Sequence, residues 1–409
     1  MSHLEVRGNL SFLKGAYIKD PAVIDSTTVH FDAQMMARYG QAGPRYISYP
    51  TAPQFKREIT AQEYILAATQ SDQALKREPL SVYVHIPFCF SPCFYCGCNR
   101  VITRDVAQAE RYLHYLKREI AMRGRHFDRR RPVEQLHFGG GTPTFLPKPL
   151  LDDLMGELAQ QFQLIDSAER DYSIEIDPRT VDRGTLELLK DLQFNRLSLG
   201  VQDFDPAVQR AVNREQPVKM VEGIYAAARE LGFQSINFDL IYGLPLQTMD
   251  SFSTTLDRVI ALRPDRLAVY GYAHMPQLFK AQGKILSEQL PDSAARMALL
   301  QLAIERLGAA GYLYIGLDHF ALPSDSLVQA KQTAAPRVVS RGLTGVMLGN
   351  PGFDWKTPKI SLEYAHASSP LARTSGHASF HAGHGIRSFS AGVATNCELP
   401  PGDLPVAGS

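Results

Sequence analysis

The chain has 409 residues, of which 44% are hydrophobic and 21% are charged, and its formal net charge is +1. This is the composition of a globular protein with room for one large domain and a smaller part, and it gives no sign of a nucleic-acid or anionic-membrane surface. The sequence has no apolar run long enough to cross a bilayer and no signal-peptide core at its N-terminus, so we expect a cytoplasmic protein.

The first part of the chain shows little regular pattern. Residues 1–30 have neither a helical nor a strand period and are expected to be a flexible extension. Residues 31–79 contain the turn sequences GPRY and YPTAP, followed by a helical pattern at 59–70. Irregular chain of this kind needs a surface to lie against, so we expect this N-terminal segment to pack on the domain that follows.

From residue 80 strand and helix patterns alternate. Strand patterns occur at 81–87, 133–139, 172–177, 196–202, 235–243 and 266–273, and helical patterns at 109–124, 150–162, 185–193, 218–232 and 251–262. Repeated β–α units of this length indicate a parallel sheet. We therefore predict an α/β fold, an open, partial (β/α)6 barrel over residues 80–290, with its ligand at the C-terminal edge of the strands.

The composition changes at about residue 331. A strong helical pattern at 294–312 lies in a region, 291–330, that we expect to begin a C-terminal part of the fold. Beyond it the chain is rich in Gly, Pro and Ser and keeps no period. Residues 331–409 are therefore expected to be an unpatterned tail, disordered or truncated.

The cysteines carry the clearest chemical signal. Cys89, Cys93 and Cys96 follow the first strand pattern in a C-x3-C-x2-C arrangement. Thiols this close in a cytosolic protein indicate metal ligands or redox groups. Three thiolates on a [4Fe–4S] cluster leave one iron open, and S-adenosylmethionine (SAM) can chelate that iron through its amino and carboxylate groups.

Two other interpretations of the cysteines stay open. Zinc normally recruits a second ligand pair, yet the remaining cysteine outside the cluster, Cys397, lies in the tail. Cys98 is separated from Cys96 by a single residue, which would strain simultaneous ligation. We therefore interpret Cys98 as a structural or reducible thiol, with ligation as its alternative.

Polar residues gather where the later strands end. The sequence GGGTPT begins at Gly139, and its glycines allow backbone to approach a ligand closely. Each of the polar side chains that follow could be only a hydrogen-bond partner inside the barrel. Together they indicate a ligand site, in which Asp239 suits a ribose diol and Arg214 suits a carboxylate. The set comprises Glu175, Gln202, Arg214 and Asp239.

The motifs extend over roughly residues 31–330. They include GPRYISYPTA, YVHIPFC-x3-C-x2-CGCN, HFGGGTPT, SIEIDPR, RLSLGVQDF, VNREQ, FDLIYGLP, YGYAHMP and GLDHFALP. Together they resemble the oxygen-independent coproporphyrinogen III oxidases of the radical SAM superfamily. By position, the resemblance implies SAM contacts at Tyr83, Tyr95, Gly140, Gly141, Thr142, Glu175, Gln202, Arg214, Asp239 and Ala273.

The resemblance also implies a reaction. A 5′-deoxyadenosyl radical takes hydrogen from a propionate side chain, carbon dioxide leaves, and the last electron passes to an acceptor. Two such steps turn coproporphyrinogen III into protoporphyrinogen IX in haem synthesis. The expected partners are the porphyrinogen and an unidentified one-electron donor protein, and we expect a monomer.

The resemblance ends in the C-terminal part. Family members continue after the DHFA segment with an Arg-, Gly- and aromatic-rich loop and a helical domain, whereas this chain has AAPRVVSRGLTGVMLGNPGFDW. We interpret this as a shifted reading frame or truncation near residue 332. Two alternatives to an active oxidase follow, a related radical SAM haem chaperone and the inactive product of a damaged gene. Cys98 and GPRYISYPTA favour the oxidase over the chaperone.

Overall fold

The computed structural model describes residues 60–332, except 75, 76 and 317, together with residue 34 and the segments 344–349, 360–361 and 396–397. The expected extension at 1–30, all of 31–59 except residue 34, and most of the tail after 332 lie outside the described residues. In the described part of the chain, no helix is both long and apolar enough to span a membrane.

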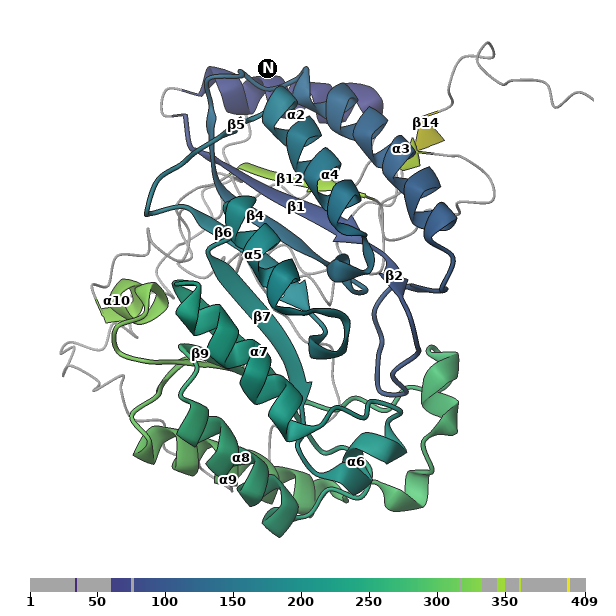
Figure 1. The fold of residues 1–409 in the computed structure, drawn as a ribbon, viewed down its shortest axis with the longest axis vertical. Helices are drawn as coiled ribbons and strands as arrows, with labels where there is room; N and C mark the ends of the chain where they lie inside the picture. Colours follow the sequence, from purple (N-terminus) through teal and green to yellow (C-terminus); the bar gives the residue numbers. More distant parts are fainter. Residues whose placement is uncertain are drawn as a thin grey trace, which may run out of the picture.

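Six parallel strands form the centre of the molecule (Figure 1). Each pairs with the next in the order of the chain, because every strand is followed by a helix that returns the chain across the sheet. The predicted partial (β/α)6 barrel is confirmed. The strands are β1 (Leu80–Ile86), β4 (Pro132–Gly140), β6 (Asp171–Ile176), β7 (Arg196–Gln202), β8 (Ser235–Tyr242) and β9 (Arg266–Gly271).

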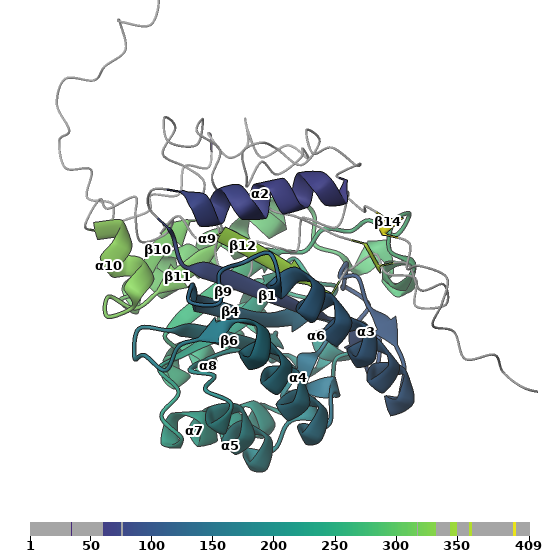
Figure 2. The same cartoon turned by 90° about the horizontal axis from the view of Figure 1, so that it is seen from above.

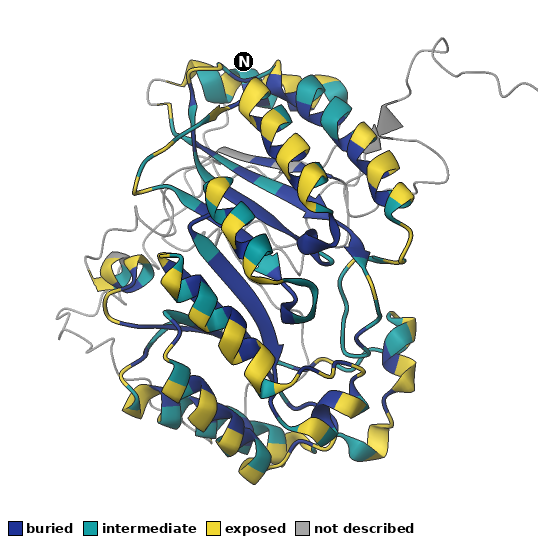
Figure 3. Cartoon of the chain, viewed as in Figure 1, coloured by how far each residue is buried: buried dark blue, intermediate teal, exposed yellow. Residues whose placement is uncertain are grey.

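The helices cover the largely buried strands and expose one face to solvent (Figure 3). Apolar and polar residues alternate along strands such as RLSLGVQ and SINFDLIY, so one face of each strand packs in the core and the other carries Ser198, Asn237 and Asp239. Side-chain caps start several of the helices, as where the Asp182 carboxylate accepts from the Thr185 N–H at 2.7 Å. The long helices are α3 (Val106–Gly124), α4 (Lys148–Gln161), α5 (Arg183–Asp191), α7 (Val218–Glu230), α8 (Met249–Leu262) and α9 (Ser293–Ala309).

One further helix, α2 (Ala61–Gln73), precedes the barrel and lies over its β1 side (Figure 2). Thr60 and Glu63 form a capping box at its start. The buried Arg123 guanidinium of α3 stacks over the Tyr64 ring of α2 at 5.3 Å, and Arg131 donates to Asp72 at 2.8 Å. These contacts fix α2 against α3 and the start of β4.

The sheet is extended at both ends. Beyond β9 it continues with antiparallel β11 (His319–Ala321) and β10 (Leu313–Gly316). Beyond β1 it gains a parallel strand, β12 (Thr344–Leu348), with Val346 and Leu348 buried. The expectation of unpatterned chain after residue 331 is therefore wrong for this segment, which forms a strand because the edge of β1 offers it backbone partners.

Shorter elements, none of them expected from the sequence, connect these parts. They are β2 (Phe88–Cys89), β3 (Val101–Ile102), β5 (Gln163–Leu164), β13 (Ile360–Ser361), β14 (Asn396–Cys397), α6 (Pro206–Ala211), α10 (Ser326–Gln332), η3 (Pro143–Phe145), η4 (Pro178–Thr180), η5 (Lys280–Lys284) and η6 (Ser287–Gln289).

Candidate cofactor site

A cavity of about 630 Å³ opens at the C-terminal edge of the parallel strands. Its walls are the cysteine loop after β1, the ends of β4, β6 and β7 with the segments that follow them, and Asp239 of β8. A cavity of this size can hold one drug-sized ligand, and this edge is where open α/β folds bind ligands. The expected position of the site is thus the position of the cavity.

The cysteine loop is fixed by backbone contacts at both ends. Thr103 donates its N–H to the Cys89 carbonyl at 3.0 Å, and Phe94 donates to the Val212 carbonyl at 2.9 Å. Within the loop, the Arg100 guanidinium donates to the carbonyls of Cys96 at 2.9 Å and Cys93 at 3.3 Å. The loop therefore has a definite shape before any cofactor is considered.

Four clustered cysteines line the cavity, and none of them forms a disulfide in the described part of the chain: Cys89, Cys93, Cys96 and Cys98. Among the described residues, no three His, Cys, Asp or Glu side chains converge on a position for a single ion. A four-iron cluster does not require convergence on one point, because each thiolate binds a different iron.

The environment of Cys89 favours a neutral thiol until a metal binds. Burial raises the pKa of the Cys89 thiol to about 11, although the Thr142 hydroxyl opposes this by donating to its sulfur at 3.5 Å. The Cys98 N–H donates to the Cys96 sulfur at 3.4 Å. Such N–H donors support a sulfur that carries negative charge, as a metal-bound thiolate does.

The glycine segment at the end of β4 lies against the backbone of the cysteine loop. Gly141 donates its N–H to the Ile86 carbonyl and Thr142 donates to the Phe88 carbonyl, both at 2.8 Å. A Cβ on Gly141 would lie 2.7 Å from the Phe88 oxygen, and Gly140 has a φ of +116°. Only glycine allows this close approach, which brings an unobstructed strip of backbone beside Cys89.

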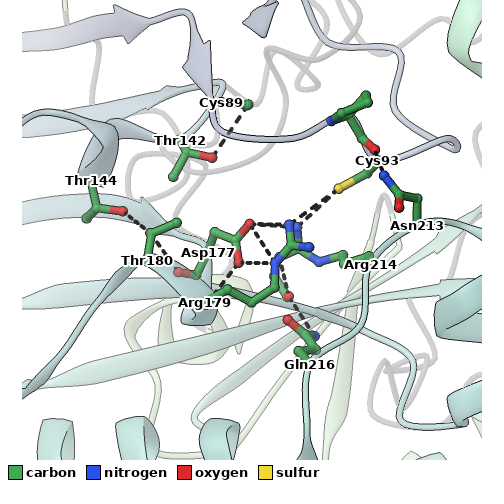
Figure 4. Close-up of polar contacts among 12 residues, drawn as sticks. Cys89, Cys93, Thr142, Thr144, Asp177, Arg179, Thr180, Asn213, Arg214 and Gln216 are labelled. Carbon is green, nitrogen blue, oxygen red and sulfur yellow. Dashed lines mark hydrogen bonds and ion pairs between the residues drawn. The ribbon is translucent and has the colours of Figure 1, made fainter. Parts of the chain in front are cut away.

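The segment after β7 brings Gln202 and Arg214 to the cavity. Gln202 has a φ of +67° and follows a bulge in the β7–β8 ladder. The buried Arg214 donates to the Gly200 carbonyl at 2.7 Å and to the Asp177 carboxylate at 3.1 Å. The Arg214 guanidinium also approaches the Cys93 sulfur at 3.4 Å (Figure 4).

Asp239 forms the floor of the cavity from the interior of β8, where it is only 2% exposed. Asn237 donates to its carboxylate at 2.9 Å, and the Ser198 hydroxyl donates at 3.3 Å. Asn237 also donates to the Ser198 oxygen at 3.1 Å. Two neighbouring strands thus hold this carboxylate in one orientation.

Most of the expected SAM-contact residues come together at the cavity, whose walls include Tyr95, Gly140, Gly141, Thr142, Glu175, Gln202, Arg214 and Asp239. Tyr83 and Ala273 are not among the lining residues. Tyr83 lies behind the glycine segment, with its ring stacked on His137 and its hydroxyl 3.2 Å from His85 Nδ1. The Ala273 carbonyl accepts from Gln282, which also donates to the Tyr95 carbonyl.

The structure adds lining residues that the sequence analysis gave no role: Arg100, Asp177 and Arg179. Burial alone would raise the pKa of Asp177, but Arg214 and Arg179 hold it at about 2. Asp177 and Arg179 belong to the motif SIEIDPR, directly after β6. Their place at a strand end was the signal that they face the cavity.

The family comparison agrees with this geometry. A model of the radical SAM superfamily matches residues 83–259. The oxygen-independent coproporphyrinogen III oxidase of Pseudomonas aeruginosa is 52% identical over 305 residues, which is 75% of this chain and 66% of that protein. The Helicobacter pylori (strain J99) protein of the same name is 42% identical over 313 residues, or 76% of this chain and 68% of its own length.

A solved structure gives the same result. Coproporphyrinogen III oxidase from Escherichia coli, described as a radical SAM enzyme, is similar with a TM-score of 0.69 and 44% identity. The match covers 75% of this chain and 67% of that one. The chain thus spans about two thirds of the length of the relatives it matches.

Proposed function

The chain belongs to the family of oxygen-independent coproporphyrinogen III oxidases, and we propose that its site serves the oxidative decarboxylation of coproporphyrinogen III to protoporphyrinogen IX in haem synthesis. The observation that carries this proposal is the meeting of three spaced cysteines and a glycine strip in one cavity at the strand ends. The relatives named above are called oxidases, which favours this function over the haem chaperone.

The residues present fit the two cofactors of the radical SAM superfamily. Cys89, Cys93 and Cys96 would hold a [4Fe–4S] cluster from a single loop. Gln202 Oε1 is buried without a hydrogen-bond partner in the described structure, although Gln202 lines the cavity. A bound ligand could donate a hydrogen bond to this oxygen. Without a ligand, the buried and unpaired oxygen lowers the stability of the folded protein.

Each polar wall would bind one part of SAM. Arg214 suits the carboxylate because its guanidinium is buried and permanently charged. Asp239 suits the ribose hydroxyls, since its orientation is fixed by Asn237 and Ser198. The backbone at Gly140 and Gly141, with Thr142 and Glu175 beside it, suits the amino group. Tyr83, Tyr95 and Ala273 remain proposed contacts; Tyr95 lines the cavity, whereas Tyr83 and Ala273 do not.

The chemistry that the cluster and SAM supply when bound is abstraction of a hydrogen atom from the substrate propionate. The chain's part is to bind, to orient and to keep water away. Burial of Arg214 and Asp239 strengthens their contacts to a charged ligand by lowering the local dielectric. The partners we propose are the porphyrinogen and a one-electron donor protein, acting with a monomer in the cytoplasm.

The proposal is tested by anaerobic reconstitution of the chain with iron and sulfide. We expect about four irons per chain, loss of the cluster in Cys93→Ala, and its retention in Cys98→Ala, because Cys98 supports its neighbour through its backbone N–H. SAM cleavage is then measured as the release of 5′-deoxyadenosine. A cluster that survives in Cys93→Ala, or haem binding without SAM cleavage, would contradict the proposal.

A further inference from the structure

The turn after β6 holds an arginine against its own aspartate. Pro178 begins the 3₁₀ turn η4, and the Asp177 carboxylate accepts the Arg179 N–H at 3.1 Å. The Arg179 side chain then folds back onto the same carboxylate, with Nε to Oδ1 at 3.0 Å and Nη2 to Oδ2 at 2.7 Å. This two-point contact fixes the plane of the guanidinium.

That orientation aims Arg179 at a cysteine ligand (Figure 4). Its Nη2 lies 3.7 Å from the Cys93 sulfur, while Arg214 Nη1 reaches the same sulfur at 3.4 Å. The Asp177 carboxylate lies between the two guanidiniums and accepts from both. One carboxylate therefore positions two cations around one thiol.

The side chains of this cluster would be balanced in charge by a metal-bound thiolate at Cys93. Two guanidiniums and one carboxylate leave one positive charge, in a setting where the side chains of Asp177 and Arg214 are only 9% and 8% exposed. Arg214 is proposed above to bind the SAM carboxylate. Arg179 then remains to face the thiolate, and no part of the proposed SAM site requires it.

We propose that Arg179, aimed by Asp177, is a positioning residue that donates a charged hydrogen bond to the Cys93 thiolate and raises the reduction potential of the bound cluster. The inference rests on the [4Fe–4S] centre proposed above. Adding one electron makes the cluster more negative, so a nearby fixed cation stabilises the reduced form more than the oxidised form. Hydrogen bonds to cluster sulfurs are a recognised means of setting this potential.

A different role for Arg179 would leave the potential unchanged. Its contact with Asp177 could serve only to close the η4 turn. Arg183, a few residues later, supplies a matched control, because it is also an arginine but pairs on the surface with Glu187 and Glu230. Loss of its charge changes the net charge of the chain equally without touching the cysteine loop.

The test is an anaerobic redox titration of the reconstituted chain with a chemical one-electron reductant, followed by the EPR signal of the reduced cluster. Arg179→Gln should lower the equilibrium constant for reduction about tenfold, which is a shift of about 59 mV to more negative potential for one electron. Arg183→Gln should titrate like the unchanged chain. Arg179→Lys keeps the positive charge but loses the two-point contact with Asp177. Its reduction potential should lie between those of Arg179→Gln and the unchanged chain.

Each result has a distinct meaning. An unchanged potential in Arg179→Gln with full iron content overturns the inference. If Arg179→Gln does not retain the cluster, the test uses Arg179→Lys instead. A reduction potential of Arg179→Lys equal to that of the unchanged chain then overturns the inference. If the unchanged chain itself binds no cluster, it is the proposed function that fails, before Arg179 is tested.

Discussion

At the scale of single residues, three arginines around the cavity have different tasks. The Arg100 guanidinium donates hydrogen bonds to backbone carbonyls of the cysteine loop and so fixes the shape of that loop. Arg179 and Arg214 reach the Cys93 sulfur and share Asp177. The same residue type thus fixes backbone in one place and faces a sulfur in another, and the roles proposed above for Arg179 and Arg214 follow from their hydrogen-bond partners.

The Asp239 contacts predict a coupled effect on SAM binding. Asp239→Ala should weaken SAM binding about 10- to 150-fold, because a charged hydrogen-bond partner is typically worth about 1.5–3 kcal/mol. Asn237→Ala should weaken it roughly fivefold, because Asn237 acts only by orienting that carboxylate. In the Asp239→Ala background, Asn237→Ala should therefore have no further effect.

The measurement is equilibrium dialysis of SAM against the reconstituted proteins, with iron content as the check on folding. Additive effects of the two substitutions would show that Asn237 acts elsewhere. An unchanged affinity in Asp239→Ala would remove the ribose assignment altogether.

The buried side chain of His85 should make the stability of the folded protein depend on pH. Burial lowers the pKa of His85 to about 4, with its Nε2 3.2 Å from the Asn99 carbonyl. Because the unfolded state binds this proton more readily than the folded state, stability is complete above about pH 6.5 and falls as the pH drops from there towards 4. The loss from this group should be about 2 kcal/mol at about pH 5.

Urea unfolding of the cofactor-free protein at about pH 7 and about pH 5 measures this difference. His85→Asn should show a pH effect smaller by that amount, although it is less stable at both values. His114→Asn, at an exposed position, should keep the full pH effect. Equal pH effects in all three proteins would mean that His85 titrates normally in the folded state. The low pKa of Asp177 affects stability only at more acidic pH.

At the scale of elements, sequence patterns predicted the repeated strands and helices of the barrel. They missed elements that form only through pairing with a segment far away in the chain. The six strands and the helices between them follow from apolar periods and their regular alternation. The strand β12 does not, because its five residues stand in Gly- and Pro-rich chain and depend on the edge of β1. At the site, strand-end position identified Glu175, Gln202 and Asp239, all of which line the cavity. It gave no role to Arg179, whose target sulfur lies 86 residues away in the chain.

The β12 strand yields a prediction of its own. Gly349 follows it with a φ of +79° and donates its N–H to the buried Glu119 carboxylate at 3.2 Å. A Cβ at this position would lie 2.6 Å from the His85 carbonyl oxygen. Gly349→Val should therefore detach β12 from β1, and hydrogen exchange of β1 amides should become about tenfold faster.

Exchange measured by mass spectrometry on peptides of β1 tests this. Gly156→Val is the matched control, because a Cβ there meets open space on helix α4. It should leave exchange in β1 unchanged. Equal exchange in the unchanged chain and in Gly349→Val would show that β12 does not protect the edge of β1.

At the scale of the whole molecule, one edge of the sheet carries the chemistry and the rest supports it. The strands deliver Glu175, Gln202 and Asp239 to that edge, and the loop after β1 delivers the thiols. The cavity of about 630 Å³ suits a single drug-sized ligand. A tetrapyrrole bound beside SAM needs further walls, and about a third of each relative's length lies outside the region matched here.

That comparison leads to a prediction of two separable activities. The cluster ligands and the proposed SAM contacts all lie within the barrel, so the 409-residue chain should bind the cluster and cleave SAM slowly without substrate. It should convert little or no coproporphyrinogen III, because a carbon radical must be enclosed with its substrate and the barrel supplies only one wall. An extended version, which also carries the part of these relatives outside the matched region, should convert it. An anaerobic assay of both versions, measuring protoporphyrinogen and 5′-deoxyadenosine together, distinguishes the cases. The extended version should yield the two products in a fixed ratio, and the 409-residue chain only the second. Full conversion by the 409-residue chain would show that it encloses the porphyrinogen by itself. If neither version cleaves SAM, the proposed cluster and SAM site in the barrel is wrong.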